Sequence, residues 1–243
     1  MIRYTTARLS ETGAREGNQD VARWRCVGET TCWALADGLG GHRGGRAAAE
    51  AAVDAILDAF EQGPGVTADA VATYVDAAHA AVHARQGERP EWRDARSTVV
   101  VLVANGTRAI WGHVGDSRLY RFRGARLVGQ TQDHSVPQAL VAAGEISARE
   151  ARGHEDRNRV LRALGRPEAV EAAIAPAPVT VVPDDAFLLC TDGLWEGVTE
   201  LEMTVERAKA RNADDWLRRL EDRVLLSSAD AHDNYTALAI CAL

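Results

Sequence analysis

The chain has 243 residues, of which 46% are hydrophobic and 26% are charged, and it carries a formal net charge of −7 at pH 7. This length suits one domain around one large core, and the composition is that of an ordinary globular protein. The acidic excess argues against broad, non-specific nucleic-acid binding, which needs a basic surface to displace counterions from phosphates. An acidic balance suits cation binding instead.

The N-terminus lacks the apolar run of a secretory signal, and no later run approaches the roughly 20 apolar residues that cross a bilayer. We therefore expect a cytoplasmic protein without a membrane partner. The cysteines have no metal-type CxxC spacing and are expected to be reduced and structural. They are Cys26, Cys32, Cys190 and Cys241.

Strand-like segments rich in β-branched and aromatic residues recur along the chain. We expect them at residues 2–9, 21–27, 31–36, 98–104, 107–113, 117–122, 179–182, 186–191 and 235–241. Short links such as Asn105-Gly106 and Arg123-Gly124 favour hairpins, and therefore antiparallel sheets.

Amphipathic helices are expected in pairs between these runs of strands. The first pair covers residues 45–60 and 67–84, where apolar side chains recur at helical spacing. In the second pair, Thr199 and Glu202 form a capping box, and residues 214–226 again show helical spacing. Strands interrupted by paired helices predict an α+β fold, a layered sandwich of antiparallel sheets and helices.

The polar segment 132–158, called the flap below, differs from its surroundings because it contains only short helical pieces. A lid that borders an active site and a plain surface excursion are both consistent with this pattern. We expect one domain over residues 1–243, with the flap as a subdomain.

Two apolar strands end in the same dipeptide, Asp37-Gly38 and Asp192-Gly193. Asp-Gly is a strong hairpin signal, but neither dipeptide is followed by a matching strand. A carboxylate at the end of a buried strand is costly unless its charge is compensated, and a metal ion would compensate it.

Three further acids, Asp20, Asp116 and Asp233, lie at the edges of strand-like runs. Each alone could be a solvated turn residue or a cap, and only the set is suggestive. An all-oxygen ligand set indicates Mg²⁺ or Mn²⁺ rather than zinc. Two such ions can activate a shared water for attack on phosphorus, and Arg15 could grip the phosphate oxygens.

The glycine-rich loop 38–45 has a rival interpretation as a nucleotide cradle. A dinucleotide fingerprint would need glycine in place of Arg43, and a P-loop would need Lys and Ser or Thr in place of Arg46 and Ala47. The loop fails both tests. We interpret its glycines as allowing the backbone to approach a metal ion or phosphate closely.

Taken in order, the motifs resemble those of the metal-dependent protein phosphatases of the 2C type, over nearly the whole chain. They are Arg15, Asn18-Gln19-Asp20, Asp37-Gly38-Leu39-Gly40-Gly41-His42, Ser97-Thr98, Val114-Gly115-Asp116-Ser117-Arg118, Gln132-Asp133-His134-Ser135, the segment 158–165, Cys190-Thr191-Asp192-Gly193-Leu194-Trp195 and Asp233-Asn234-Tyr235-Thr236.

The resemblance implies a four-layer αββα sandwich, with the metal ions at one end between the two sheets. It implies that Asp37 bridges two core ions, that Gly38 contributes its carbonyl oxygen, and that Asp20 acts on the second ion. The first ion would be completed by Asp192 and Asp233. The resemblance also makes Asp116 the acid of a third ion, Arg15 the phosphate-gripping residue, and the flap the variable segment beside the cleft.

Two departures from the family pattern bear on the chemistry. Gln19 stands where the family often has glutamate, so the second ion could be held more loosely. Leu39 stands where animal members have a histidine proposed as general acid. His42 is left as either a proton donor or an anchor of the glycine loop, and Asn234 as a candidate auxiliary residue.

The resemblance implies hydrolysis of phosphoserine or phosphothreonine by direct attack of a metal-bridging hydroxide. The expected partners are phosphorylated proteins and an opposing serine/threonine kinase pathway, with type VI secretion as one such pathway, and the protein is expected to be monomeric. A catalytically silent phosphatase-like domain and another two-metal hydrolase, such as a nuclease, are the alternatives.

Overall fold

A computed structural model describes residues 2–40, 44–227 and 233–243. Its strands are β1 (Tyr4–Glu11), β2 (Val21–Val27), β3 (Thr30–Ala36), β4 (Gly38–Leu39), β5 (Arg96–Ser97), β6 (Val99–Ala104), β7 (Arg108–Val114), β8 (Arg118–Arg123), β9 (Arg126–Gln130), β10 (Ala173–Ile174), β11 (Val179–Thr180), β12 (Asp185–Cys190) and β13 (Tyr235–Ala242). Its helices are α1 (Gly44–Gln62), α2 (Ala68–Glu88), α3 (Val136–Ala142), α4 (Ala148–Arg152), α5 (Asp192–Trp195), α6 (Glu200–Lys209) and α7 (Ala213–Leu226), with a 3₁₀ turn η1 (Pro90–Trp92).

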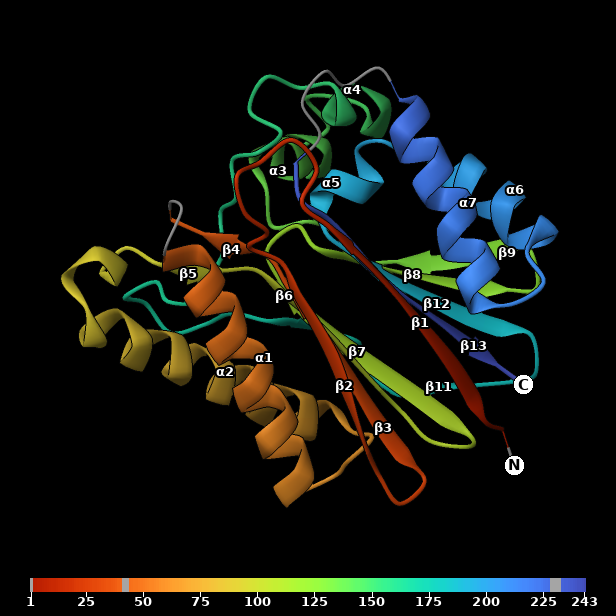
Figure 1. Ribbon diagram of the computed structural model, residues 1–243, viewed down its shortest axis with the longest axis horizontal. Coiled ribbons are helices and arrows are strands. Elements are labelled where there is room, and N and C mark those ends of the chain that lie inside the picture. The colour runs from red at the N-terminus through yellow and green to blue at the C-terminus, as the bar shows by residue number, and fades with distance from the viewer. Residues whose placement is uncertain (1, 41–43, 228–232) are drawn as a thin grey trace.

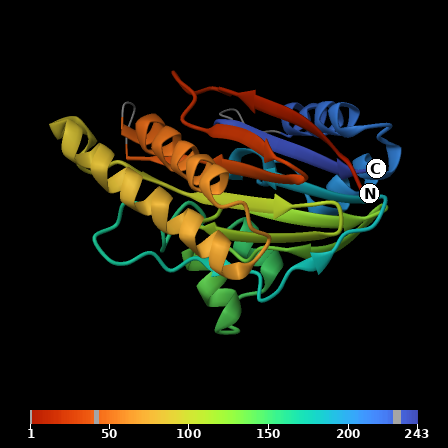
Figure 2. The same cartoon turned by 90° about the horizontal axis from the view of Figure 1, so that it is seen from below.

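The long strands form two antiparallel sheets that lie face to face, with helices on their outer faces (Figure 1). The first sheet has the order β1-β13-β12-β8-β9, and the second has the order β10-β7-β6-β3-β2, with β11 also paired to β7. Figure 2 shows α1 and α2 side by side on the outer face of the second sheet. The expected four-layer αββα sandwich is confirmed.

Three apolar layers hold the sandwich together. Between the sheets, the buried layer includes Trp33, Leu102 and Phe187. The helix pair α1 and α2 buries a second layer against its sheet, and α5 to α7 bury a third layer, with Trp216 at its centre. The central strand β6 reads VVVLVA and is buried throughout, as expected for a strand covered on both faces.

The long helices α1, α2, α6 and α7 begin within one residue of the predicted positions. Thr67 caps α2 by accepting a hydrogen bond from the backbone of Ala70, and the expected capping box of Thr199 and Glu202 is present at the start of α6. None of the helices in the described ranges combines the length and the apolar character that a membrane crossing requires.

Some short elements were not predicted from the sequence. They are β9, which completes the hairpin after β8, the small β4-β5 sheet, β10, the 3₁₀ turn η1 and the short helix α5. The predicted strand 179–182 shortens to β11, and the flap contains the short helices α3 and α4, in agreement with the short helical pieces expected in this segment. The cysteines are free, as expected; Cys26 is exposed and the other three are buried.

Candidate metal centre and active site

Strand register brings the candidate acids to one end of the sandwich. In the second sheet, the start of β2 lies opposite the end of β3, because Val21 pairs with Ala36, and the end of β7 lies opposite the start of β6. In the first sheet, Cys190 at the end of β12 pairs with both Arg118 and Ala237. The segments that carry the acids therefore leave both sheets on the same side.

These segments surround a cavity of about 320 Å³. Its lining contains predicted site residues from distant parts of the chain: Arg15, Asp37, Gly38, Asp116, Asp192, Asp233 and Asn234. Asp20 is buried near this lining. Repulsion from Asp233 contributes to raising the pKa of Asp20, as expected for neighbouring carboxyl groups. Two further lining residues, Asn158 and Val160, follow the flap helices and belong to the 158–165 motif, for which the sequence alone predicted no separate role.

The carboxyl groups raise one another's pKa around this cavity. Burial is the largest cause, raising the pKa of Asp20 to about 6 and that of Asp116 to about 7. The pKa values of Asp37 and Asp192 are raised well above the usual range, first by burial and then by repulsion from neighbouring acids. Concentrated negative charge of this kind marks functional sites and is relieved by a bound cation.

Three features of the site fit a hard metal ion. Asp20 and Asp116, each 2% exposed, have one buried carboxylate oxygen, Oδ1, without a hydrogen-bond partner. A side chain on Gly38 would place its Cβ 2.1 Å from the carbonyl oxygen of Gly45, so only glycine fits there. The donor atoms are oxygens, which Mg²⁺ and Mn²⁺ prefer. Within the described ranges, no three His, Cys, Asp or Glu side chains are already gathered as a ready ligand set.

Asp20 is oriented by threonines from the first sheet. The Thr191 hydroxyl donates to Asp20 Oδ2 at 2.9 Å, and Thr191 Oγ1 accepts from the Thr236 backbone at 3.0 Å. The Asp20 backbone donates to the Asn18 side chain at 2.8 Å. These bonds fix one oxygen of Asp20 and leave the other without a protein partner.

Asp37 is held mainly through its backbone. Its carbonyl oxygen accepts from the Thr98 backbone at 2.9 Å and from the Ser97 hydroxyl at 2.8 Å, and its N–H donates to Thr98 Oγ1 at 3.1 Å. Ser97 and Thr98 belong to a motif noted in the sequence, but their positioning of Asp37 could not be read from it.

Asn234 ties the N-terminal loop to the strand end that carries Asp233. Its side-chain oxygen accepts from the Gln19 backbone at 2.8 Å, and its amide donates to the carbonyls of Thr12 and Gly17 at 2.8 and 3.0 Å. Its own backbone donates to Asp233 Oδ1 at 2.8 Å. The auxiliary residue predicted from the sequence is thus a structural clamp at the cavity.

The remaining candidates are placed as follows. Arg15 pairs with Asp233 through two hydrogen bonds of 2.9 and 2.6 Å at the cavity mouth. Leu39 lines the cavity. His42, the sequence candidate for proton donor or loop anchor, lies outside the described residues.

Comparison with known sequences finds protein phosphatases. The family model described as Protein phosphatase 2C matches residues 10–230. The serine/threonine phosphatase stp of Listeria monocytogenes is 31% identical over 215 residues, covering 85% of this chain and 82% of that protein. The serine/threonine protein phosphatase PstP of Mycobacterium tuberculosis is 34% identical over 207 residues, covering 84% of this chain and 39% of that protein.

Solved structures agree with these matches. The catalytic domain of PstP in complex with 2 manganese ions is 27% identical with a TM-score of 0.85, and each chain covers 100% of the other. PppA of Pseudomonas aeruginosa, described as a key regulatory component of T6SS, is 29% identical with a TM-score of 0.77, covering 99% of this chain and 98% of that chain. Because the family model spans most of the sequence, the chain belongs to the protein phosphatase 2C family.

Proposed function

We propose that this protein is a metal-dependent phosphatase that hydrolyses phosphoserine and phosphothreonine in proteins. The observation that carries the proposal is the set of acids that repel one another around a single cavity with Arg15 at its mouth. Such a site binds cations and, through them, the phosphate of a monoester. The names of the related phosphatases support the same substrate class.

We propose Asp37 and the carbonyl of Gly38, together with Asp192 and Asp233, as ligands of a first hard cation. Asp37 and Asp20 would serve a second cation, and Asp116 a third. The bound ions, Mn²⁺ or Mg²⁺, supply positive charge and lower the pKa of water at this end of the sandwich. The two manganese ions named for the PstP catalytic domain support this assignment.

The other roles belong to the chain's own side chains. Arg15 would bind the non-bridging oxygens of the phosphate, because a guanidinium can donate two parallel hydrogen bonds to them. Asn234 would hold the loop that carries Arg15, since its amide donates to Thr12 and Gly17 on either side of it. Asn158, the last residue of the flap, lines the cavity and would contact the substrate near the phosphate.

The physiological substrates would be phosphoproteins of a serine/threonine kinase pathway in the cytoplasm. The similarity to PppA supports type VI secretion as one such pathway. A catalytically silent domain is not favoured, because Asp37, Asp116, Asp192 and Asp233 all line one cavity. A monomeric state remains a prediction, which size-exclusion chromatography with light scattering would test.

The proposed activity is tested with p-nitrophenyl phosphate and with a phosphothreonine peptide. Metal-free protein is expected to be inactive, and Mn²⁺ is expected to restore hydrolysis of both substrates, with EDTA abolishing it. Asp192→Asn should remain inactive at any Mn²⁺ concentration, while its circular dichroism stays that of the wild type. Absence of hydrolysis by the manganese-loaded wild type would instead support the silent alternative.

A further inference from the structure

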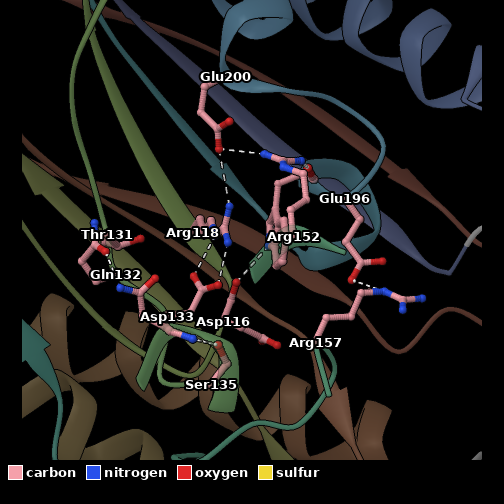
Figure 3. A network of polar contacts seen from close by, with 12 residues as sticks. Asp116, Arg118, Thr131, Gln132, Asp133, Ser135, Arg152, Arg157, Glu196 and Glu200 are labelled. Carbon is pink, nitrogen blue, oxygen red and sulfur yellow. Dashed lines mark hydrogen bonds and ion pairs between the residues drawn. The ribbon is translucent and has the colours of Figure 1, made fainter. Parts of the chain in front are cut away.

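A polar network connects the flap with the acids of the cavity (Figure 3). In this network, Trp195 contacts two arginines, with the Arg118 guanidinium 3.5 Å and the Arg152 guanidinium 5.8 Å from the ring centroid. Trp195 is 3% exposed. Because the contacts are desolvated, the attraction between the two cations and the ring stabilises this position of Trp195.

Trp195 connects two of the candidate acids. Its indole N–H donates to the backbone oxygen of Asp116 at 3.0 Å. The same residue ends the short helix α5, whose first residue is Asp192. The hydrogen bond therefore fixes the turn that carries Asp116 relative to the helix that carries Asp192.

Arg152, at the end of the flap helix α4, holds α5 from the other side. Its guanidinium donates to the backbone oxygens of Trp195 and Val198 and to Glu200 Oε1, the last at 2.8 Å. The backbone oxygens lie at and just beyond the C-terminal end of α5, where carbonyls have no intrahelical partner. Arg152 is thus a cap for α5 that is supplied by the flap.

Arg118 makes a second connection at the start of the flap. It donates to both carboxylate oxygens of Asp133 at 2.7 and 2.6 Å, and it lies 3.6 Å from Glu200, the acid that also pairs with Arg152. Figure 3 shows Arg118 between Asp133 and Glu200. Both ends of the flap are therefore attached to the surroundings of Trp195.

We propose that Trp195 and Arg152 are positioning residues that couple docking of the flap to cation binding at Asp116 and Asp192. When the flap is docked, Arg152 caps α5 and Trp195 holds the Asp116 turn in a fixed position relative to Asp192. When the flap detaches, both constraints are lost together. This inference rests on the proposed metal-dependent function and adds a regulatory connection to it.

The first test is Trp195→Phe, which keeps an aromatic ring beside the arginines and removes the indole donor together with part of the buried ring volume. Calorimetric titration with Mn²⁺ measures ion binding directly, and the difference between wild type and Asp116→Ala isolates the ion that depends on Asp116. For that ion we expect Trp195→Phe to lower the Mn²⁺ affinity about 10-fold, as is typical for residues that hold a metal-ligating residue in place without contacting the metal. In the Asp116→Ala background, the same substitution should change nothing further.

The second test is Arg152→Gln, with Arg149→Gln as the matched control on an exposed position of the same helix. Hydrogen exchange of metal-free protein should show about 10-fold faster exchange in α4 for Arg152→Gln and wild-type exchange for the control. Arg152→Gln should also weaken the Asp116-dependent binding of Mn²⁺. This test stands alone if Trp195→Phe fails to fold.

The outcomes separate the two proposals. A wild type without manganese-dependent hydrolysis contradicts the proposed function, whatever the variants do. A wild type that is active, with wild-type Mn²⁺ binding in both Trp195→Phe and Arg152→Gln, contradicts only the positioning role. Equal loss of Mn²⁺ affinity in Trp195→Phe with and without Asp116 would also overturn it, because the effect would then not act through Asp116.

Discussion

Arg15 and Asp233 satisfy each other through two parallel hydrogen bonds across the mouth of the cavity, although 218 residues separate them in sequence. Both side chains remain partly exposed, at 61% and 38%. The pair joins the candidate phosphate ligand to a candidate metal ligand. A cation and Arg15 therefore compete for the same carboxylate oxygens, and loading the site with metal should release Arg15 for the substrate.

The first prediction concerns the planar geometry of Arg15. Arg15→Lys keeps the charge but loses the paired donors, so KM for a phosphopeptide should rise about 10-fold with a smaller change in kcat. Inhibition by inorganic phosphate should weaken in parallel. Arg123→Lys is the control, because Arg123 makes the same two-oxygen pairing with Asp185 away from the cavity. Unchanged KM and phosphate inhibition in Arg15→Lys would contradict the assigned role.

The second prediction concerns the charge of Asp37. Burial and then the neighbouring acids raise its pKa well above the usual range, so its ionised form destabilises metal-free protein at neutral pH. Asp37→Asn should therefore raise the melting temperature of EDTA-treated protein, by about 2–4 °C per kcal/mol relieved. It should also abolish hydrolysis and the stabilisation by Mn²⁺ that the wild type shows.

The control for Asp37→Asn is Asp76→Asn, at an exposed position on α2. This variant should keep the wild-type melting temperature, hydrolysis and response to Mn²⁺. A metal-free Asp37→Asn protein that melts several degrees below the wild type would mean that Asp37 contributes to the apo fold, contrary to its electrostatic surroundings.

Much of the site could be predicted from the sequence because it lies at strand ends. Asp37 and Asp192 each follow a buried apolar run and precede a segment that is not a matching strand, and this pattern is local. The antiparallel pairing of the strands then places strand ends that are far apart in the sequence side by side in space. The clustering of the acids thus follows from the topology, which the turn signals already favour.

Other features depend on contacts that no local pattern encodes. The edge strand β9 is short, contains a register shift against β8 and is largely exposed, so it lacks a strong strand signal. The contact of Arg152 with Trp195 joins residues 43 apart in sequence. The Arg152 guanidinium donates to a backbone oxygen, and because every residue has one, the sequence does not identify this acceptor. Such a partner could be identified only from the structure.

The third prediction concerns the close approach of two backbone segments at Gly38. A Cβ at this position would lie 2.1 Å from the Gly45 carbonyl oxygen, and backbone cannot yield as a flexible side chain does. Gly38→Ala should therefore lower the free energy of unfolding by at least about 2 kcal/mol and weaken the response to Mn²⁺. Gly129→Ala on β9 meets nothing within 4 Å and should be close to neutral. Urea unfolding with and without Mn²⁺ measures both effects.

The fourth prediction concerns a stacked histidine pair next to the Asp116 turn, in which His113 is buried and His134 is partly exposed. The rings of His113 and His134 are stacked with centroids 4.7 Å apart, and His134 Nδ1 accepts the backbone N–H of Gly115 at 3.1 Å. Protonation of Nδ1 would break this bond. Burial, followed by repulsion from His113, lowers the pKa of His134 to about 4.

Because the unfolded chain takes up this proton near pH 6.5 and the folded chain only near pH 4, stability must fall as the pH drops between these values. Allowing for the partial exposure of His134, we expect a contribution on the order of 1 kcal/mol between pH 7 and pH 5. His134→Gln keeps an acceptor for Gly115 and cannot titrate. Urea unfolding of the EDTA-treated proteins should therefore show a shallower loss of stability in the variant, whereas identical pH slopes would mean that the ring is already protonated or solvated in the folded state.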